Sequence, residues 1–114
     1  MSVVIYHNPR CSKSRQTLAL LEERGIQPEI VTYLETPPSV DQLKTLMSQL
    51  ELTDVRDMMR TKEDIYKELD LKSADDETLF KAMTENPKLI ERPIVVANGK
   101  AKHGRPPEQV LDIL

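Results

Sequence analysis

The only cysteine of the chain, Cys11, is the side chain best suited to covalent chemistry. It follows shortly after an apolar, β-like run, Val3–Tyr6, and a helical pattern begins directly after it. A thiol at such a junction faces the free N–H groups and the positive end of a helix dipole, which both favour an anion. The sequence therefore predicts a reactive thiolate at neutral pH. The alternative is an inert, buried thiol, which is common for a lone cysteine.

The residues around Cys11 could activate it in several ways. Arg10, Lys13 and Arg15 are close enough along the chain to lower the pKa of the thiol, and the sequence leaves open which of them faces the sulfur. The motif is Cys-x-x-Ser, so Ser14 could hydrogen-bond a thiolate but could not resolve a disulfide. His7 could orient the thiolate, or it could cap the end of the strand.

Three arginines, Arg60, Arg92 and Arg105, lie at the ends of expected elements. A guanidinium group offers a rigid fork of donors that suits planar and tetrahedral oxyanions. Taken one at a time, each arginine is typical of a solvated surface. Their shared position at element ends favours a common role in binding an oxyanion.

Other kinds of site find little support. Cys11, His7 and His103 do not have a zinc-ligand spacing, and we expect His103 to be exposed. The three glycines are not clustered, which excludes a Gly-rich phosphate loop. We therefore expect neither a metal nor a bound cofactor.

The composition limits the class of protein. The chain has 114 residues, of which 39% are hydrophobic and 31% charged, so we expect residues 1–114 to form one globular domain. A net charge of −3 argues against a general nucleic-acid binder. No apolar stretch reaches the ~20 residues of a membrane span, and the N-terminus lacks a signal-peptide pattern. A lone cysteine suits a reducing compartment, so we expect a cytoplasmic protein, and we expect it to be a monomer.

The elements that must position these residues follow the order β-α-β, a helical stretch, then β-β-α. The expected strands are Val3–Tyr6, Glu29–Leu34, Pro93–Ala97 and Lys100–His103. The expected helices are Ser14–Arg24, a helix capped by Ser39 and Gln42, a short segment ending at Arg60, Thr61–Leu69, Asp76–Glu85 and a last one beginning at Pro106-Pro107. Asn98-Gly99 is a strong hairpin-turn pattern.

This order predicts an α/β protein with a thioredoxin-like fold. Its four-stranded mixed sheet carries a helical insertion between the second and third strands. In such a sheet the loop before the third strand packs beside the reactive thiol, often through a cis-proline. Pro93 fits that position, and the sequence leaves its isomer open.

Several motifs in this order resemble one family. They are His7-Asn8-Pro9-Arg10-Cys11-Ser12-Lys13-Ser14-Arg15, Tyr33-Leu34-Glu35-Thr36-Pro37-Pro38, Met59-Arg60, Glu91-Arg92-Pro93-Ile94-Val95-Val96 and Gly104-Arg105-Pro106. Together they resemble the glutaredoxin-coupled arsenate reductases, the ArsC family, and especially its shorter YfgD-type members. The resemblance extends over essentially the whole chain.

The resemblance implies an arsenate reductase in which Cys11 is the nucleophile. Arg60, Arg92 and Arg105 would hold the oxyanion and the arsenic adduct, while His7, Ser14 and Arg15 would surround the thiolate. The Cys11 thiolate would attack arsenate. Because the chain has no second cysteine, glutathione and then glutaredoxin would supply the external thiols. The implied partners are therefore arsenate and glutaredoxin.

Two departures from the family pattern bear on activity. Resistance-type members often have Cys-Gly-Thr-Ser-Arg and a longer tail, whereas this chain has Lys13 in that motif and ends at Leu114. We expect Lys13 to change the charge near the thiol and the shorter end to leave the site more open.

Two other functions compete with the reductase. Spx regulators share the fold and bind RNA polymerase, but they sense redox state through a Cys-x-x-Cys pair that Ser14 would interrupt. A general monothiol oxidoreductase acting on glutathione adducts would need Cys11 without Arg60 or Arg105.

Overall fold

The computed structural model describes residues 2–114, which divide into two compact units. The first consists of the described residues up to Thr36 together with Arg92–Leu114, and the second is Pro37–Glu91. The second unit is the insertion that was predicted between the second and third strands. Over residues 2–114, no helix is both long enough and apolar enough to cross a membrane.

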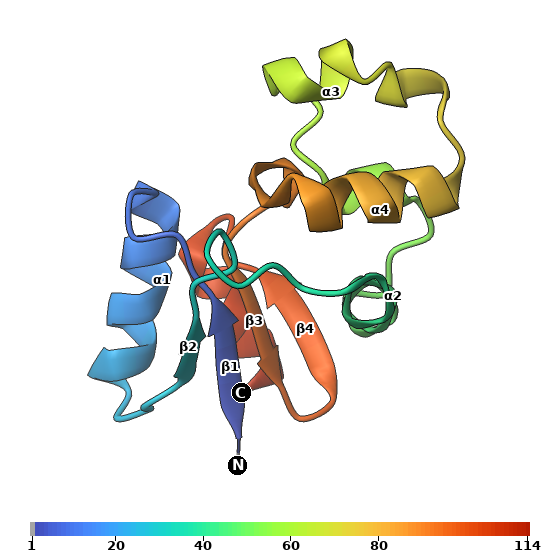
Figure 1. The fold of residues 1–114 in the computed structure, drawn as a ribbon. Helices are drawn as coiled ribbons and strands as arrows, with labels where there is room; N and C mark the ends of the chain where they lie inside the picture. Colours follow the sequence, from blue (N-terminus) through green and yellow to red (C-terminus); the bar gives the residue numbers. More distant parts are fainter. Residues whose placement is uncertain (1) are drawn as a thin grey trace. The chain divides into compact units, whose positions relative to one another are not determined.

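The first unit is built on a sheet with the strand order β2-β1-β3-β4 (Figure 1). Its strands in the described residues are β1 (Val3–Tyr6), β2 (Glu29–Val31), β3 (Ile94–Ala97) and β4 (Lys100–His103). Strand β1 pairs with β2 in parallel, and the other two pairings are antiparallel. This arrangement confirms the predicted four-stranded mixed sheet.

Strand β2 is shorter than predicted, because the chain turns before Leu34. The amides of Glu35 and Thr36 both donate to the carbonyl of Thr32, at 2.9 and 3.0 Å. These bonds close a turn that takes the backbone out of the sheet. Tyr33 is nevertheless buried, which accounts for its strand-like pattern.

Helix α1 (Ser12–Glu23) begins two residues earlier than predicted. Its N-cap is Cys11, a residue type that does not usually start a helix, so the sequence pattern pointed to a later start. Gly25 ends the helix, as predicted, with φ of 75°. Asn98 and Gly99 have φ of 56° and 75°, as the hairpin turn between β3 and β4 requires.

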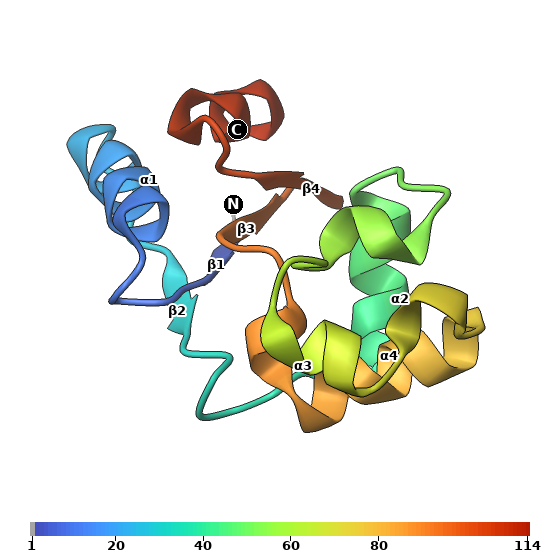
Figure 2. The ribbon, with the colours of Figure 1, turned by 90° about the horizontal axis from the view of Figure 1, so that it is seen from above.

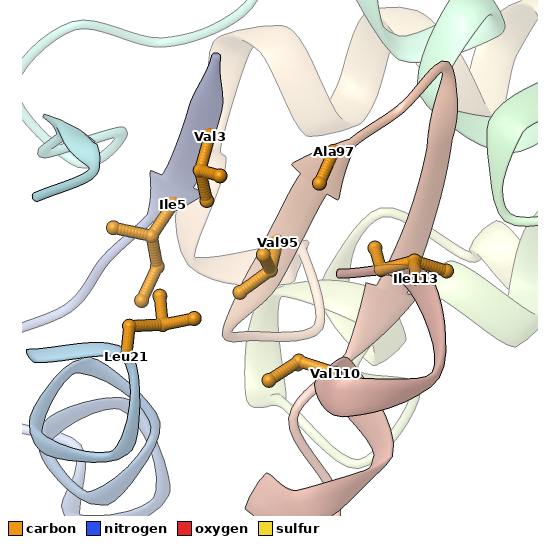
Figure 3. Close-up of a cluster of buried hydrophobic side chains, with 7 residues drawn as sticks. All are labelled: Val3, Ile5, Leu21, Val95, Ala97, Val110 and Ile113. Carbon is orange, nitrogen blue, oxygen red and sulfur yellow. The ribbon is translucent and has the colours of Figure 1, made fainter. Parts of the chain in front are cut away.

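The last helix is the 3₁₀ helix η4 (Pro107–Ile113). In a 3₁₀ helix residues three apart lie on one edge, and Pro107, Val110 and Ile113 are its buried residues. Helices η4 and α1 cover the same face of the sheet (Figure 2). The core there is a cluster of apolar side chains from β1, β3, α1 and η4 (Figure 3): Val3, Ile5, Leu21, Val95, Ala97, Val110 and Ile113.

The second unit consists of short helices. In chain order they are α2 (Val40–Gln49), η1 (Val55–Met58), α3 (Asp64–Glu68), η2 (Leu71–Ser73), α4 (Asp76–Glu85) and η3 (Pro87–Leu89). Helix α4 has the predicted bounds, whereas α3 covers only part of the predicted helix Thr61–Leu69. The capping box of α2 is confirmed by hydrogen bonds in both directions between Ser39 and Gln42.

Arg56 organises the middle of this unit. Its Nη2 donates to the carbonyls of Leu71, Lys72 and Ala74 at 2.8 to 2.9 Å. Its Nε donates to the hydroxyl of Tyr66 at 3.1 Å. One guanidinium group thereby fixes the path of the chain around η2.

Candidate active site

Cys11 lies at the junction of the loop that follows β1 and the first turn of α1. Its amide donates to the carbonyl of Asn8 at 3.0 Å, and the amide of Arg10 donates to the Asn8 side chain at the same distance. Asn8 is buried, so the loop is held in a defined turn. The thiol itself is partly exposed. The inert, buried thiol considered above is therefore not what the structure contains.

The pKa of the Cys11 thiol is lowered from its ordinary value of 9.0. Burial acts in the opposite direction and raises it. The backbone N–H groups of Ser14 and Lys13, and the hydrogen bond and charge of Arg92, outweigh burial and favour the thiolate. Within the described residues, the Cys11 side chain accepts no capping hydrogen bond. The amides of Lys13 and Ser14 therefore act on the sulfur as nearby dipoles.

The cation beside the sulfur comes from the far end of the chain. Arg10 and Lys13 are exposed, and the guanidinium of Arg15 donates to the carbonyl of Pro9 at 2.9 Å. Arg92 is brought to the thiol by strand pairing, because Tyr6 at the end of β1 is opposite Ile94 at the start of β3. The residues after β1 and the residues before β3 therefore meet at one edge of the sheet.

Ser14 reaches the thiol through its backbone, while its hydroxyl group is engaged elsewhere. The hydroxyl oxygen lies 2.6 Å from His7 Nδ1 and accepts a 3.0 Å hydrogen bond from the amide of Asn8. All three residues are buried. Burial, and secondarily the charge of Arg15, lower the pKa of His7 from 6.5, so the imidazole is neutral at pH 7. His7 thus contacts the residue that supports the thiolate.

Arg92 and Arg105 both precede prolines joined by cis peptide bonds, Arg92–Pro93 and Arg105–Pro106. The amide of Gly104 donates to the carbonyl of Pro93 at 3.0 Å, and Arg105 Nη1 donates to the carbonyl of Arg92 at 3.1 Å.

The first unit contains six of the seven site residues predicted from the sequence, namely Cys11, His7, Ser14, Arg15, Arg92 and Arg105.

Arg60 belongs to the second unit, just after η1. Its Nε lies 3.2 Å from Glu63 Oε1, and its Nη1 lies 3.4 Å from Glu91 Oε1. Neither carboxylate was predicted as a partner of Arg60. The spacing of three residues between Arg60 and Glu63 was a usable pattern, whereas nothing local pointed to Glu91.

Thr17, Gly104 and Asn8 also lie in or next to the elements around the thiol, and none of them was predicted as a site residue. Thr17 is buried, and its hydroxyl donates to the carbonyl of Lys13 at 2.8 Å. Asn8 and Gly104 stand in the motifs quoted above but had no role assigned, because neither side chain itself performs chemistry, and Thr17 lies outside those motifs. Within residues 2–114, no group of three or more His, Cys, Asp or Glu side chains could hold a metal ion.

The chain is similar to several known proteins over almost its whole length. A model of the ArsC family matches residues 6–113. The protein YfgD of Escherichia coli K12 is 60% identical over 114 residues, which cover 98% of this chain and 96% of YfgD. An arsenate reductase of Haemophilus influenzae is 58% identical over 116 residues and all of both chains. The solved structure of an arsenate reductase from Vibrio cholerae is 67% identical and superposes with a TM-score of 0.98 over 100% of this chain and 98% of that one. This chain, with its thioredoxin-like fold, belongs to the ArsC family.

Proposed function

We propose that this protein is an arsenate reductase in which the Cys11 thiolate attacks a bound arsenate. The observation that carries the proposal is a partly exposed thiol of lowered pKa at the start of α1, with the Arg92 guanidinium beside it. Relatives named arsenate reductase that are similar over their full length support the choice of substrate.

In the proposed reaction, arsenate binds to Arg92 and Arg105 near the N-terminal amides of α1. The family resemblance assigns the same role to Arg60, and we propose that role on this basis alone. The Cys11 sulfur attacks arsenic, a sulfur–arsenic bond forms, and one arsenic–oxygen bond breaks with its oxygen leaving as water. His7, Ser14 and Arg15 keep the loop and the first turn of α1 in place during this step.

Reduction of arsenate to arsenite takes two electrons. The chain has one cysteine, so Cys11 supplies one thiol and an external glutathione supplies the other. The two sulfurs end as a mixed disulfide on Cys11, and arsenite is released. Glutaredoxin then reduces the mixed disulfide and restores the thiolate. We propose that residues 1–114 work as one functional domain and as a monomer in the reducing cytoplasm.

The proposal is tested by measuring arsenite production with glutathione, glutaredoxin and NADPH. We expect Cys11→Ser to reduce turnover to background, because a hydroxyl group is not a nucleophile of comparable strength. Arg92→Ala should lower kcat/KM by roughly 100-fold, since it removes an oxyanion donor and a group that stabilises the thiolate. Arg24→Ala, an exposed arginine at the opposite end of α1, is the matched control and should leave turnover unchanged.

Two results would contradict the proposal. Arsenite production that survives in Cys11→Ser would remove the nucleophile. Reduction of glutathione mixed disulfides at full rate in wild type and in Arg105→Ala, without any arsenate turnover, would favour the monothiol oxidoreductase instead.

A further inference from the structure

Gly104 lies where helix α1 and the Arg92–Pro93 segment come closest. A methyl group added to Gly104 would overlap Thr17 Oγ1 and would lie 2.8 Å from Pro93 Cγ and 3.1 Å from Thr17 Cγ2. These separations are shorter than carbon–carbon contact distances in packed proteins. Glycine is therefore required here for lack of space.

Neither neighbour of Gly104 can easily move aside. Thr17 is fully buried, and its hydroxyl is tied to the carbonyl of Lys13 at 2.8 Å. Pro93 is also buried, and its ring has no flexible end that could turn away. A side chain at position 104 would therefore be accommodated by moving backbone, with α1 and Pro93 pushed apart.

The backbone of Arg92 and Pro93 is hydrogen-bonded to the two residues that follow β4. Gly104 donates its amide hydrogen to the Pro93 carbonyl, and Arg105 donates from Nη1 to the Arg92 carbonyl. These adjacent donors meet adjacent acceptors because Ile94 pairs with His103 in the antiparallel β3–β4 ladder. Any displacement of Gly104 from Pro93 is therefore also a displacement of Arg92.

We propose that Gly104 is a positioning residue of the site: with no side chain between Thr17 and Pro93, it lets the Arg92–Pro93 segment pack against α1 and keeps the Arg92 guanidinium beside the Cys11 sulfur. Helix α1 carries Cys11 at its N-cap, so the separation of α1 from Pro93 sets the separation of sulfur and guanidinium. Arg92 is among the groups that lower the pKa of Cys11, which gives the fit a measurable consequence.

This inference rests on the proposed function only in treating Cys11 as the reacting group. Its test needs no arsenate, because it follows alkylation of the thiol by iodoacetamide as a function of pH. Failure of arsenate turnover in the wild type would count against the proposed function and would leave the alkylation result intact.

The central variant is Gly104→Ala. We expect its alkylation rate at pH 6.5 to fall roughly three- to tenfold, with the midpoint of the pH profile moved upward, because Arg92 withdraws from the sulfur. Arg92→Ala should shift the profile in the same direction. The double variant Gly104→Ala/Arg92→Ala should react no more slowly than Arg92→Ala alone, since Gly104 acts through that guanidinium.

Val110→Ala is the control for simple loss of stability, because Val110 belongs to the core cluster of the same unit. It should lower the unfolding midpoint and leave the pH profile of alkylation unchanged. If circular dichroism shows that Gly104→Ala does not fold, Thr17→Ala/Gly104→Ala removes the Thr17 overlap and keeps the contact with Pro93. A folded variant of either kind with the wild-type pH profile would overturn the inference, and so would effects of Gly104→Ala and Arg92→Ala that multiply.

Discussion

Helices α1 and α2 both begin after an extended residue, but their first amides are used in different ways. At α2, Ser39 Oγ accepts from the amide of Gln42 at 3.1 Å, and Gln42 Oε1 accepts from the amide of Ser39 at 2.8 Å. At α1, the N-cap is Cys11, and the amides of Lys13 and Ser14 act on its sulfur. The first backbone N–H groups of α2 are engaged in capping hydrogen bonds that stabilise the helix. Those of α1 instead face the sulfur and stabilise its negative charge.

The two helix starts also differ in burial. Among residues 2–114, the buried polar side chains are His7, Asn8, Ser14 and Thr17, all in or just before the first two turns of α1. Ser39 and Gln42 at the start of α2 are exposed. Buried polar groups are tolerated only when they are hydrogen-bonded, and those around α1 have partners. The buried, hydrogen-bonded polar side chains of the described residues therefore lie around the thiol.

The largest effect expected from this contrast is that of Ser14→Ala. The change leaves the Asn8 amide and His7 Nδ1 buried without their present partner. Unpaired buried polar groups cost about 1–3 kcal/mol each, so two of them should lower the free energy of unfolding by at least about 2 kcal/mol. Urea unfolding of wild type and variant measures this change in the free energy of unfolding. Ser48→Ala, at an exposed serine of α2, is the matched control and should change stability by less than about 0.5 kcal/mol.

A second test uses the pH dependence of stability. The pKa of His7 is lowered in the folded protein, by burial first and then by Arg15, so below pH 6.5 the unfolded chain takes up a proton that the folded protein does not. The free energy of unfolding is then unaffected by His7 above pH 6.5 and decreases as the pH falls below it. One proton limits this slope to about 1.4 kcal/mol per pH unit.

His7→Gln should remove that part of the slope. Urea unfolding of wild type and variant between pH 7.5 and the onset of acid unfolding, roughly pH 5, compares the two. Parallel curves for the two proteins would show that His7 titrates as it does in the unfolded chain, and the contrast in burial would fail at this residue.

The smallest effect is expected at the start of α2. Ser39→Ala removes an exposed cap, and we expect a loss of about 1 kcal/mol in the free energy of unfolding. Ser39→Asp should retain most of the stability, because a carboxylate also accepts from the Gln42 amide. If Ser39→Ala destabilises the protein more than Ser14→Ala does, burial is not what distinguishes the two helix starts.

Local patterns predicted much of the fold. The bounds of β1 and α4, the capping box at Ser39 and the turn at Asn98-Gly99 were all confirmed. Each depends on side chains a few residues apart, which is the range over which a sequence pattern carries information. The predicted end of β2 at Leu34 was wrong. Strand β2 ends earlier because the amides of Glu35 and Thr36 donate to the Thr32 carbonyl, and bonds between backbone groups do not depend on side-chain type.

Local sequence patterns place one thiol between a strand and a helix and put arginines at the ends of other elements. Which cation lies beside that thiol depends on the pairing of strands that are distant along the chain. Arg10, Lys13 and Arg15 are its neighbours along the chain, yet Arg92 reaches it, because antiparallel pairing of Tyr6 with Ile94 brings the end of β1 to the start of β3. The same ladder, continued by Ile94 with His103, places Gly104 against Pro93. Strand register joins residues that are distant in sequence, and only the folded sheet specifies it.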